Sequence, residues 1–192
     1  MKKLLLTAVL TGLSGVAAAN GWYVQGDVGA SKLQAKEEGG KIKDTKPYGR
    51  VSVGKDLGNF RYAFDYTYFG TLKNTDNYGT DGYHKAKLNA HSAGISGFYD
   101  FHNTTPLTPY VGLRASLNYL SLDTNGETDT VQYSHSHDKT QVGIGGLVGA
   151  QYQFTDKLAA NAGLEYNYLG KVGPVDTKIS QYGANVGLRY NF

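Results

Sequence analysis

The chain contains no cysteine, one methionine, one tryptophan and four prolines among its 192 residues. Without cysteine, disulfides and thiolate metal sites are excluded. The sequence also lacks any apolar run that approaches the ~20 residues of a membrane-spanning helix. Its formal net charge of +3 is too small to indicate a nucleic-acid-binding surface. If the chain crosses a membrane, it must do so as a closed barrel, because a closed barrel pairs all its strand backbone groups within lipid.

Glycine and tyrosine are abundant instead, with 26 and 16 copies. This composition is typical of an all-β protein of one domain. Residues 1–19 carry two lysines, an apolar run and three final alanines, which is the pattern of a secretory signal peptide. We therefore expect residues 20–192 to form the folded domain, and no cofactor is expected.

The final stretch of the chain, residues 182–192, alternates between apolar and polar or glycine residues up to the last position. The apolar positions are Tyr182, Ala184, Val186, Leu188, Tyr190 and Phe192. A period of two residues is typical of a β-strand with two different faces. Because chain ends are normally frayed and solvated, a terminal strand with an aromatic end predicts a sheet that closes on itself.

Seven earlier segments show the same alternation: 21–33, 47–57, 60–72, 87–101, 109–122, 140–154 and 158–172. Short turns join some of these segments, and long polar segments join the others. We predict loops at 34–46, 73–86 and 123–139, with a shorter one at 173–177. Short turns at one end and long loops at the other predict an eight-stranded antiparallel transmembrane β-barrel of the outer-membrane type. Side chains fill the lumen of a barrel of about eight strands.

The polar stripe of these strands indicates which face meets lipid. It contains glycine, serine, asparagine and glutamine, with few charged residues. Those residues are Arg50, Asp56, Arg61, Asp65, Asp100, Arg114, Glu165 and Arg189. Four positive and four negative side chains suit a packed interior in which charges are paired. We therefore place the apolar stripe in lipid, whereas a soluble lipocalin-like barrel would need lysine and glutamate on its outer face.

A two-residue turn at 58–59 predicts the register of one hairpin. In that register Asp56 meets Arg61, and Ser52 meets Asp65, with Arg50 one diagonal step from Asp65. Opposite charges would therefore lie beside one another on the polar face.

The predicted loops contain candidate binding residues: Lys36, Lys41, Lys43, Tyr83, His84, Tyr133, His135 and His137. A basic loop suits sulfated glycans or lipopolysaccharide phosphates, although a solvated loop explains the same residues. His135 and His137, with Asp138, suggest a metal site, but no further ligand is evident. We interpret this segment as a solvated loop and predict no metal site.

Two other patterns resemble a phosphate-binding loop and a catalytic pair, but neither has the required arrangement. The glycine-rich run 143–149 lacks the G-x-G-x-x-G spacing of a phosphate-binding loop, and no helix follows. His91 and Ser92 are the only available pair for a lipid-modifying hydrolase, yet adjacent strand residues point to opposite faces. We therefore expect no catalytic residues.

Several segments resemble the neisserial opacity proteins. They are K-P-Y-G-R-V-S-V-G-K-D-L-G-N-F-R-Y-A-F-D-Y (46–66), G-F-Y-D-F (97–101), T-P-Y-V-G-L-R-A-S (108–116), T-D-K-L-A-A-N-A-G-L-E-Y-N-Y-L-G-K-V (155–172) and the final R-Y-N-F. The resemblance implies an eight-stranded outer-membrane barrel of a Gram-negative bacterium. It also implies that Tyr190 and Phe192 form the signal recognised by the barrel-assembly machinery.

Members of that family act as surface adhesins that engage host-cell receptors or glycosaminoglycans through loops facing the cell exterior. The resemblance therefore implies an adhesin in contact with outer-membrane lipids and lipopolysaccharide. Two alternatives stay open: a structural or weakly conducting porin-like barrel without a receptor, and a less favoured lipid A-modifying enzyme.

Overall fold

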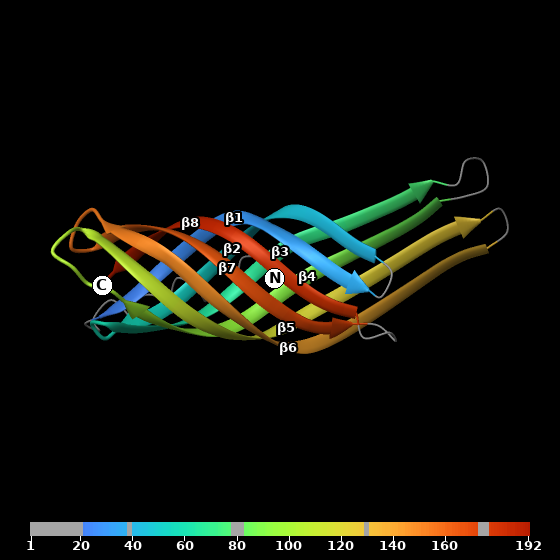
Figure 1. The fold of residues 1–192 in the computed structure, drawn as a ribbon. Helices are drawn as coiled ribbons and strands as arrows, with labels where there is room; N and C mark the ends of the chain where they lie inside the picture. The colour runs from blue at the N-terminus through green and yellow to red at the C-terminus, as the bar shows by residue number, and fades with distance from the viewer. Residues whose placement is uncertain (1–20, 38–39, 78–82, 129–130, 173–176) are drawn as a thin grey trace.

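The computed structural model describes residues 21–37, 40–77, 83–128, 131–172 and 177–192. Eight strands form a closed antiparallel barrel in which each pairs with its neighbours in the chain, and β1 also pairs with β8 (Figure 1). The strands are β1 (Trp22–Glu37), β2 (Gly40–Asp56), β3 (Phe60–Asn77), β4 (Tyr83–Asp100), β5 (Leu107–Thr128), β6 (Val131–Gln153), β7 (Leu158–Val172) and β8 (Thr177–Asn191). The predicted fold class is confirmed.

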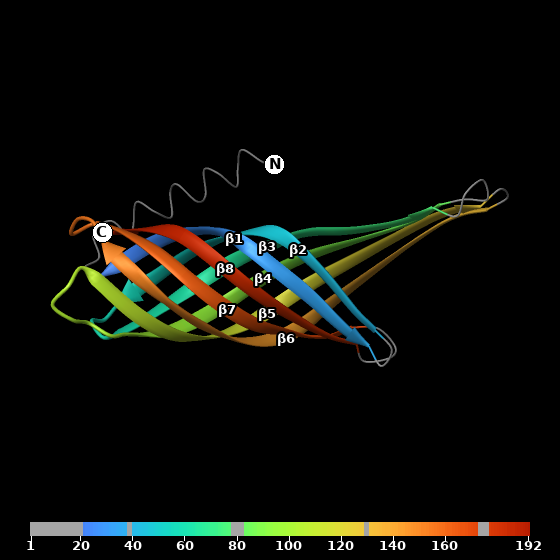
Figure 2. The ribbon, with the colours of Figure 1, turned by 45° about the horizontal axis from the view of Figure 1, so that its top comes forward.

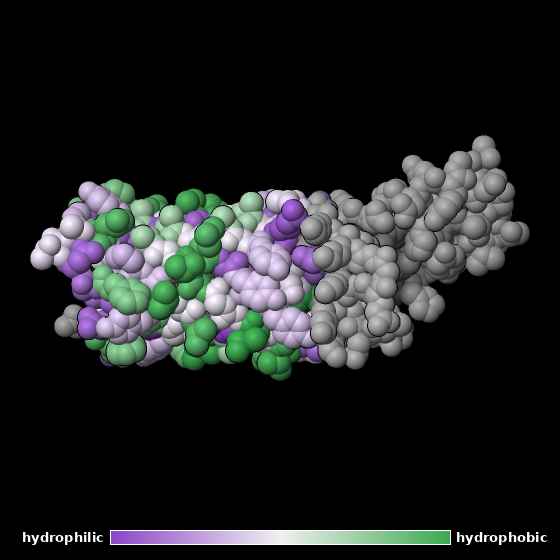
Figure 3. All heavy atoms as spheres, viewed as in Figure 1, coloured by the Kyte–Doolittle hydropathy of each residue, from purple (hydrophilic) through white to green (hydrophobic). Residues whose placement is uncertain are grey.

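The apolar stripe faces outward, as predicted. On β5, for example, Leu113 is 70% exposed whereas its neighbour Arg114 is 1% exposed. In Figure 3, apolar side chains gather over the middle of the barrel wall, with more hydrophilic residues toward the end that carries the short turns. An apolar outer band around a polar interior is the arrangement of a barrel surrounded by lipid. Across the described part of the chain, no helix has the length and hydropathy to cross a membrane.

The strands continue through most of the segments predicted as long loops. Pairing of β1 with β2 extends to Glu37 and Gly40, and pairing of β5 with β6 extends to Thr128 and Val131. The predicted boundaries 34–46, 73–86 and 123–139 are therefore wrong. In these segments the sequence no longer alternates between apolar and polar residues, because neither face of the strand needs to meet lipid. The main-chain pairing does not depend on that alternation and therefore continues. The four hairpin tips, at 38–39, 78–82, 129–130 and 173–176, lie outside the described residues.

The barrel wall divides toward the long-hairpin end. Pairing of β2 with β3 stops at Gly49 and Tyr68, and pairing of β6 with β7 stops at Ile144 and Tyr168, although all four strands continue. Beyond these two seams, β3, β4, β5 and β6 remain paired with one another. They project as a four-stranded sheet farther than the other strands (Figures 1 and 2).

A register shift accompanies each seam. One lies between Tyr68 and Thr71 in β3, and the other lies between Tyr168 and Gly170 in β7. Each shift contains a glycine at positive φ, which other residues rarely adopt. The shifts turn Phe69 and Leu169 inward, where both are buried. There they join an apolar cluster formed by Tyr48, Phe69, Ala90, Leu120, Leu169 and Ile179, which we call the apolar layer.

Candidate functional site

Between the apolar layer and the short turns, the lumen is filled by paired charges. The structure places the seven predicted ion-pair residues, together with Asp100, on the inner side of the barrel wall. The ion pairs are Arg50–Glu165 (2.8 Å), Arg50–Asp65 (3.7 Å), Arg61–Asp100 (2.8 Å), Arg114–Asp65 (2.5 Å) and Arg189–Asp56 (2.5 Å). Pairing of this kind allows charges to remain buried.

Asp65 is the centre of the larger group. It accepts hydrogen bonds from Arg114 Nε and Nη2 and from the Thr67 hydroxyl (3.0 Å). The same Arg114 Nη2 donates to Ser92 Oγ at 3.0 Å, and Arg50 Nε donates to Thr67 Oγ1 at 2.8 Å. Side chains of β2, β3, β4 and β5 are thereby joined in one network around the Asp65 carboxylate.

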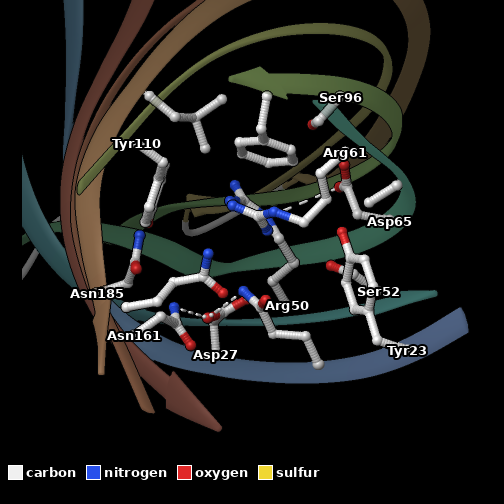
Figure 4. A pocket seen from close by; sticks show the side chains of 15 residues that line it. Tyr23, Asp27, Arg50, Ser52, Arg61, Asp65, Ser96, Tyr110, Asn161 and Asn185 are labelled. Carbon is white, nitrogen blue, oxygen red and sulfur yellow. Dashed lines mark hydrogen bonds and ion pairs between the residues drawn. The ribbon is translucent and has the colours of Figure 1, made fainter. Parts of the chain in front are cut away.

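Arg61 lies in a second group, surrounded by aromatic rings. Its guanidinium carbon is 4.3 Å from the ring centre of Phe98, 5.2 Å from that of Tyr110 and 5.8 Å from that of Tyr23. Its Nε and Nη2 donate to the two oxygens of Asp100 at 2.8 and 3.0 Å. Figure 4 shows Arg61 among the side chains that line a small internal cavity of about 20 Å³. A space of that size holds about one water molecule, so these groups close the lumen.

The pairing differs in part from the sequence prediction. The register does place Asp56 opposite Arg61 and Ser52 opposite Asp65. The predicted register is therefore confirmed, but the ion pairs join Arg61 to Asp100 and Asp56 to Arg189. In a narrow lumen, a long arginine side chain reaches strands other than its register neighbour.

Asp27 is an interior acid that the list of predicted charges lacked. It is 4% exposed and accepts hydrogen bonds from Gln25 Nε2 (3.0 Å) and Asn161 Nδ2 (2.7 Å). Figure 4 shows Asp27 and Asn161 joined in this way. Its inward phase on the first strand is the signal that could have identified it. The described lumen therefore holds five carboxylates and four guanidiniums rather than equal numbers.

The weaker chemical candidates do not form a site. His91 Nδ1 lies 2.6 Å from the Tyr66 hydroxyl on the outer wall, whereas Ser92 is buried beside Arg114. The glycine-rich run lies within β6, where Gly146 is opposite Tyr166. Within the described ranges, no three His, Asp or Glu side chains are grouped to hold a metal.

The predicted binding residues lie in the long hairpins: the lysines in the β1–β2 hairpin, and the tyrosines and histidines in the projecting sheet. Lys36 pairs with Lys41 between β1 and β2, and Tyr83 and His84 begin β4. The register places Tyr133, His135 and His137 in β6, whose partner β5 also pairs with β4. The two long hairpins are therefore side by side. The side chains of all eight candidates lie outside the described residues.

The chain end closes the barrel. The Phe192 amide donates to the Trp22 carbonyl at 3.0 Å, and its ring packs edge-on against Tyr190 with 5.4 Å between centres. Tyr190 and Phe192 lie at the end of the barrel that carries the short turns.

A sequence model described as Opacity family porin protein matches residues 53–192. The chain belongs to the opacity family. It is 38% identical over 193 residues to an uncharacterised protein of Haemophilus influenzae, and the match covers the whole of both chains. It is 34% identical over 140 residues to Protein opa of the same organism (73% of this chain, 100% of the relative). An opacity protein of Neisseria gonorrhoeae is 27% identical over 183 residues (74% and 77%).

Solved structures agree with this family. The crystal structure of neisserial surface protein A matches with a TM-score of 0.65 and 31% identity, covering 90% of this chain and 98% of the other. The attachment invasion locus protein of Yersinia pestis matches in fold alone, with a TM-score of 0.54 and 14% identity, covering 88% and 99%. The resemblance drawn from the sequence is confirmed, and this opacity-family protein is an outer-membrane barrel.

Proposed function

We propose that this opacity-family barrel is a surface adhesin whose projecting sheet binds host-cell receptors or glycans. The projection of β3, β4, β5 and β6 beyond the two seams carries the proposal. This sheet is the most extended part of the described molecule, and strand pairing holds its two hairpins side by side. A filled lumen offers no path for bulk diffusion, which favours a function on the outer surface over transport.

The orientation follows from the same asymmetry. Short turns face the periplasm and longer connections face the cell exterior in barrels of this class, so the projecting sheet would meet other cells. The Yersinia barrel of the same fold has been crystallised with a heparin analogue, sucrose octasulfate. Sulfated glycans are therefore the first ligand class to test.

Shortening the projecting hairpins tests this function. Replacing residues 73–87 and 123–136 by Asn-Gly turns would join the register pairs on either side and retain the barrel. We expect cells displaying this variant to lose binding to host cells. A matched control replaces residues 35–42 between β1 and β2 in the same way, and binding should persist.

Heat-modifiable gel mobility would show that both variants remain folded. Unchanged cell binding by the variant with shortened projecting hairpins would contradict the adhesin function. It would favour the structural barrel instead. Altered lipid A in expressing cells would point to the enzyme alternative.

Assembly partners form a separate part of the proposal. We infer that the barrel-assembly machinery recognises the terminal Tyr190 and Phe192, and that the outer wall contacts outer-membrane lipids and lipopolysaccharide. Phe192→Ala should lower the amount of folded barrel in the outer-membrane fraction. An unchanged amount would exclude Phe192 as the recognised signal.

A further inference from the structure

The outer wall of the barrel carries an apolar groove of about 790 Å³ that crosses β5, β6, β7, β8 and β1. Its lining includes the small residues Gly26, Ala150, Ala160 and Ala162, beside bulkier residues such as Tyr152 and Leu188. The register explains this shape. Ala150 is opposite Ala162, and Ala160 lies between Tyr152 and Leu188, so small side chains on β7 form a floor between larger neighbours.

The groove lies in the half of the wall nearest the short turns. Ala160 is two positions from Leu158, where β7 begins after the short β6–β7 turn. Lys157 and Asp156 are both exposed in that turn. Their opposite charges leave no net charge to select a headgroup.

We propose that this groove binds one acyl chain of a diacyl phospholipid. The groove is continuous with the lipid-facing wall, so its surroundings are hydrocarbon, and apolar walls suit a chain rather than a headgroup. The choice of phospholipid over lipopolysaccharide rests on the orientation proposed above, which places the short turns toward the periplasmic leaflet.

A second copy of the barrel is a poorer occupant. Two barrels related by a two-fold axis would present the same face to each other. Two facing hollows would leave a void between them, and a void forfeits packing contacts. A flexible chain can instead follow the floor along β7.

Filling the groove tests the proposal. In Ala160→Leu/Ala162→Leu, larger side chains would occupy the floor. The matched control, Ala93→Leu/Ala115→Leu, adds the same atoms at lipid-facing alanines of β4 and β5 away from the groove. The readout is native mass spectrometry of each purified barrel, equilibrated in mild detergent with phosphatidylethanolamine or phosphatidylglycerol. Heat-modifiable mobility would first show that each variant is folded.

The unchanged protein and the control should each retain one phospholipid, with either headgroup, through increasing collisional activation. The filled variant should retain about tenfold less, because it loses the contact area of several methylene groups. Equal retention by the filled variant, or no retention by the unchanged protein, would overturn the proposal. A dimer that disappears on filling would assign the groove to a second copy, and preferential retention of lipid A would overturn the choice of lipid.

Discussion

Asp65 shows how much of this molecule depends on single buried residues. Its carboxylate forms an ion pair with Arg114 and lies 3.7 Å from the Arg50 Nε. One side chain therefore balances the charge of arginines from two strands. The inward stripe of the sequence identified Asp65, Arg114 and Arg50 as interior residues. Partner choice could not be predicted for Arg61, because side-chain reach across the lumen depends on barrel diameter and strand tilt.

Asp65→Asn is expected to destabilise the barrel strongly. The free energy of unfolding should fall by about 3–5 kcal/mol, because the variant leaves the buried Arg114 guanidinium without its charge partner and removes one of the two partners of Arg50. Denaturant titration of the protein folded in lipid vesicles measures this change. Asp56→Asn is the matched control. The Asp56 side chain is 30% exposed, and Arg189 keeps its hydrogen bonds to Gln151 and Asn191, so this variant should cost only about 1–2 kcal/mol. Equal losses in the two variants would refute the central role of Asp65.

At the scale of the strands, the seams and their register shifts set where the barrel ends and the projecting sheet begins. The sequence contains Tyr68-Phe69-Gly70 and Tyr168-Leu169-Gly170 at the two shifts. Simple alternation could not predict that Phe69 and Leu169 turn inward, because a bulge breaks the period of two. The ends of the projecting strands were missed for a related reason. The sequence of those ends has no apolar stripe that would reveal a strand.

Gly170→Ala should weaken the seam beside β7. Gly170 has φ +109°, and an added Cβ would lie 2.8 Å from the Gln141 Cβ. Backbone strain of this kind costs about 1–3 kcal/mol, which the same titration would detect. Gly146→Ala is the control on β6, where an added Cβ meets nothing within 4 Å, and its effect should stay within about 0.5 kcal/mol. If both substitutions were neutral, the seam glycine would not be required.

At the scale of the whole molecule, the eight-stranded barrel could be predicted because lipid imposes one rule on every strand. Apolar residues alternate with polar ones along the wall, and the register of one hairpin followed from the turn at 58–59. The binding surface could not be predicted equally well. No such rule acts on the projecting hairpins, whose sequence shows no apolar alternation, so charge and aromatic content were the only signals there.

The central claim is that the apolar stripe meets lipid while the polar stripe fills a closed lumen. Tyr110 and Val111 test it as consecutive residues of β5, the first 6% exposed and the second 44% exposed. After Trp22→Phe removes the only native tryptophan, Tyr110→Trp and Val111→Trp each provide one reporter. Quenching of tryptophan fluorescence by lipids brominated in their acyl chains is the measurement. Strong quenching of Val111→Trp with little quenching of Tyr110→Trp is the predicted result. The reverse pattern, or no quenching at either position, would contradict the barrel described here.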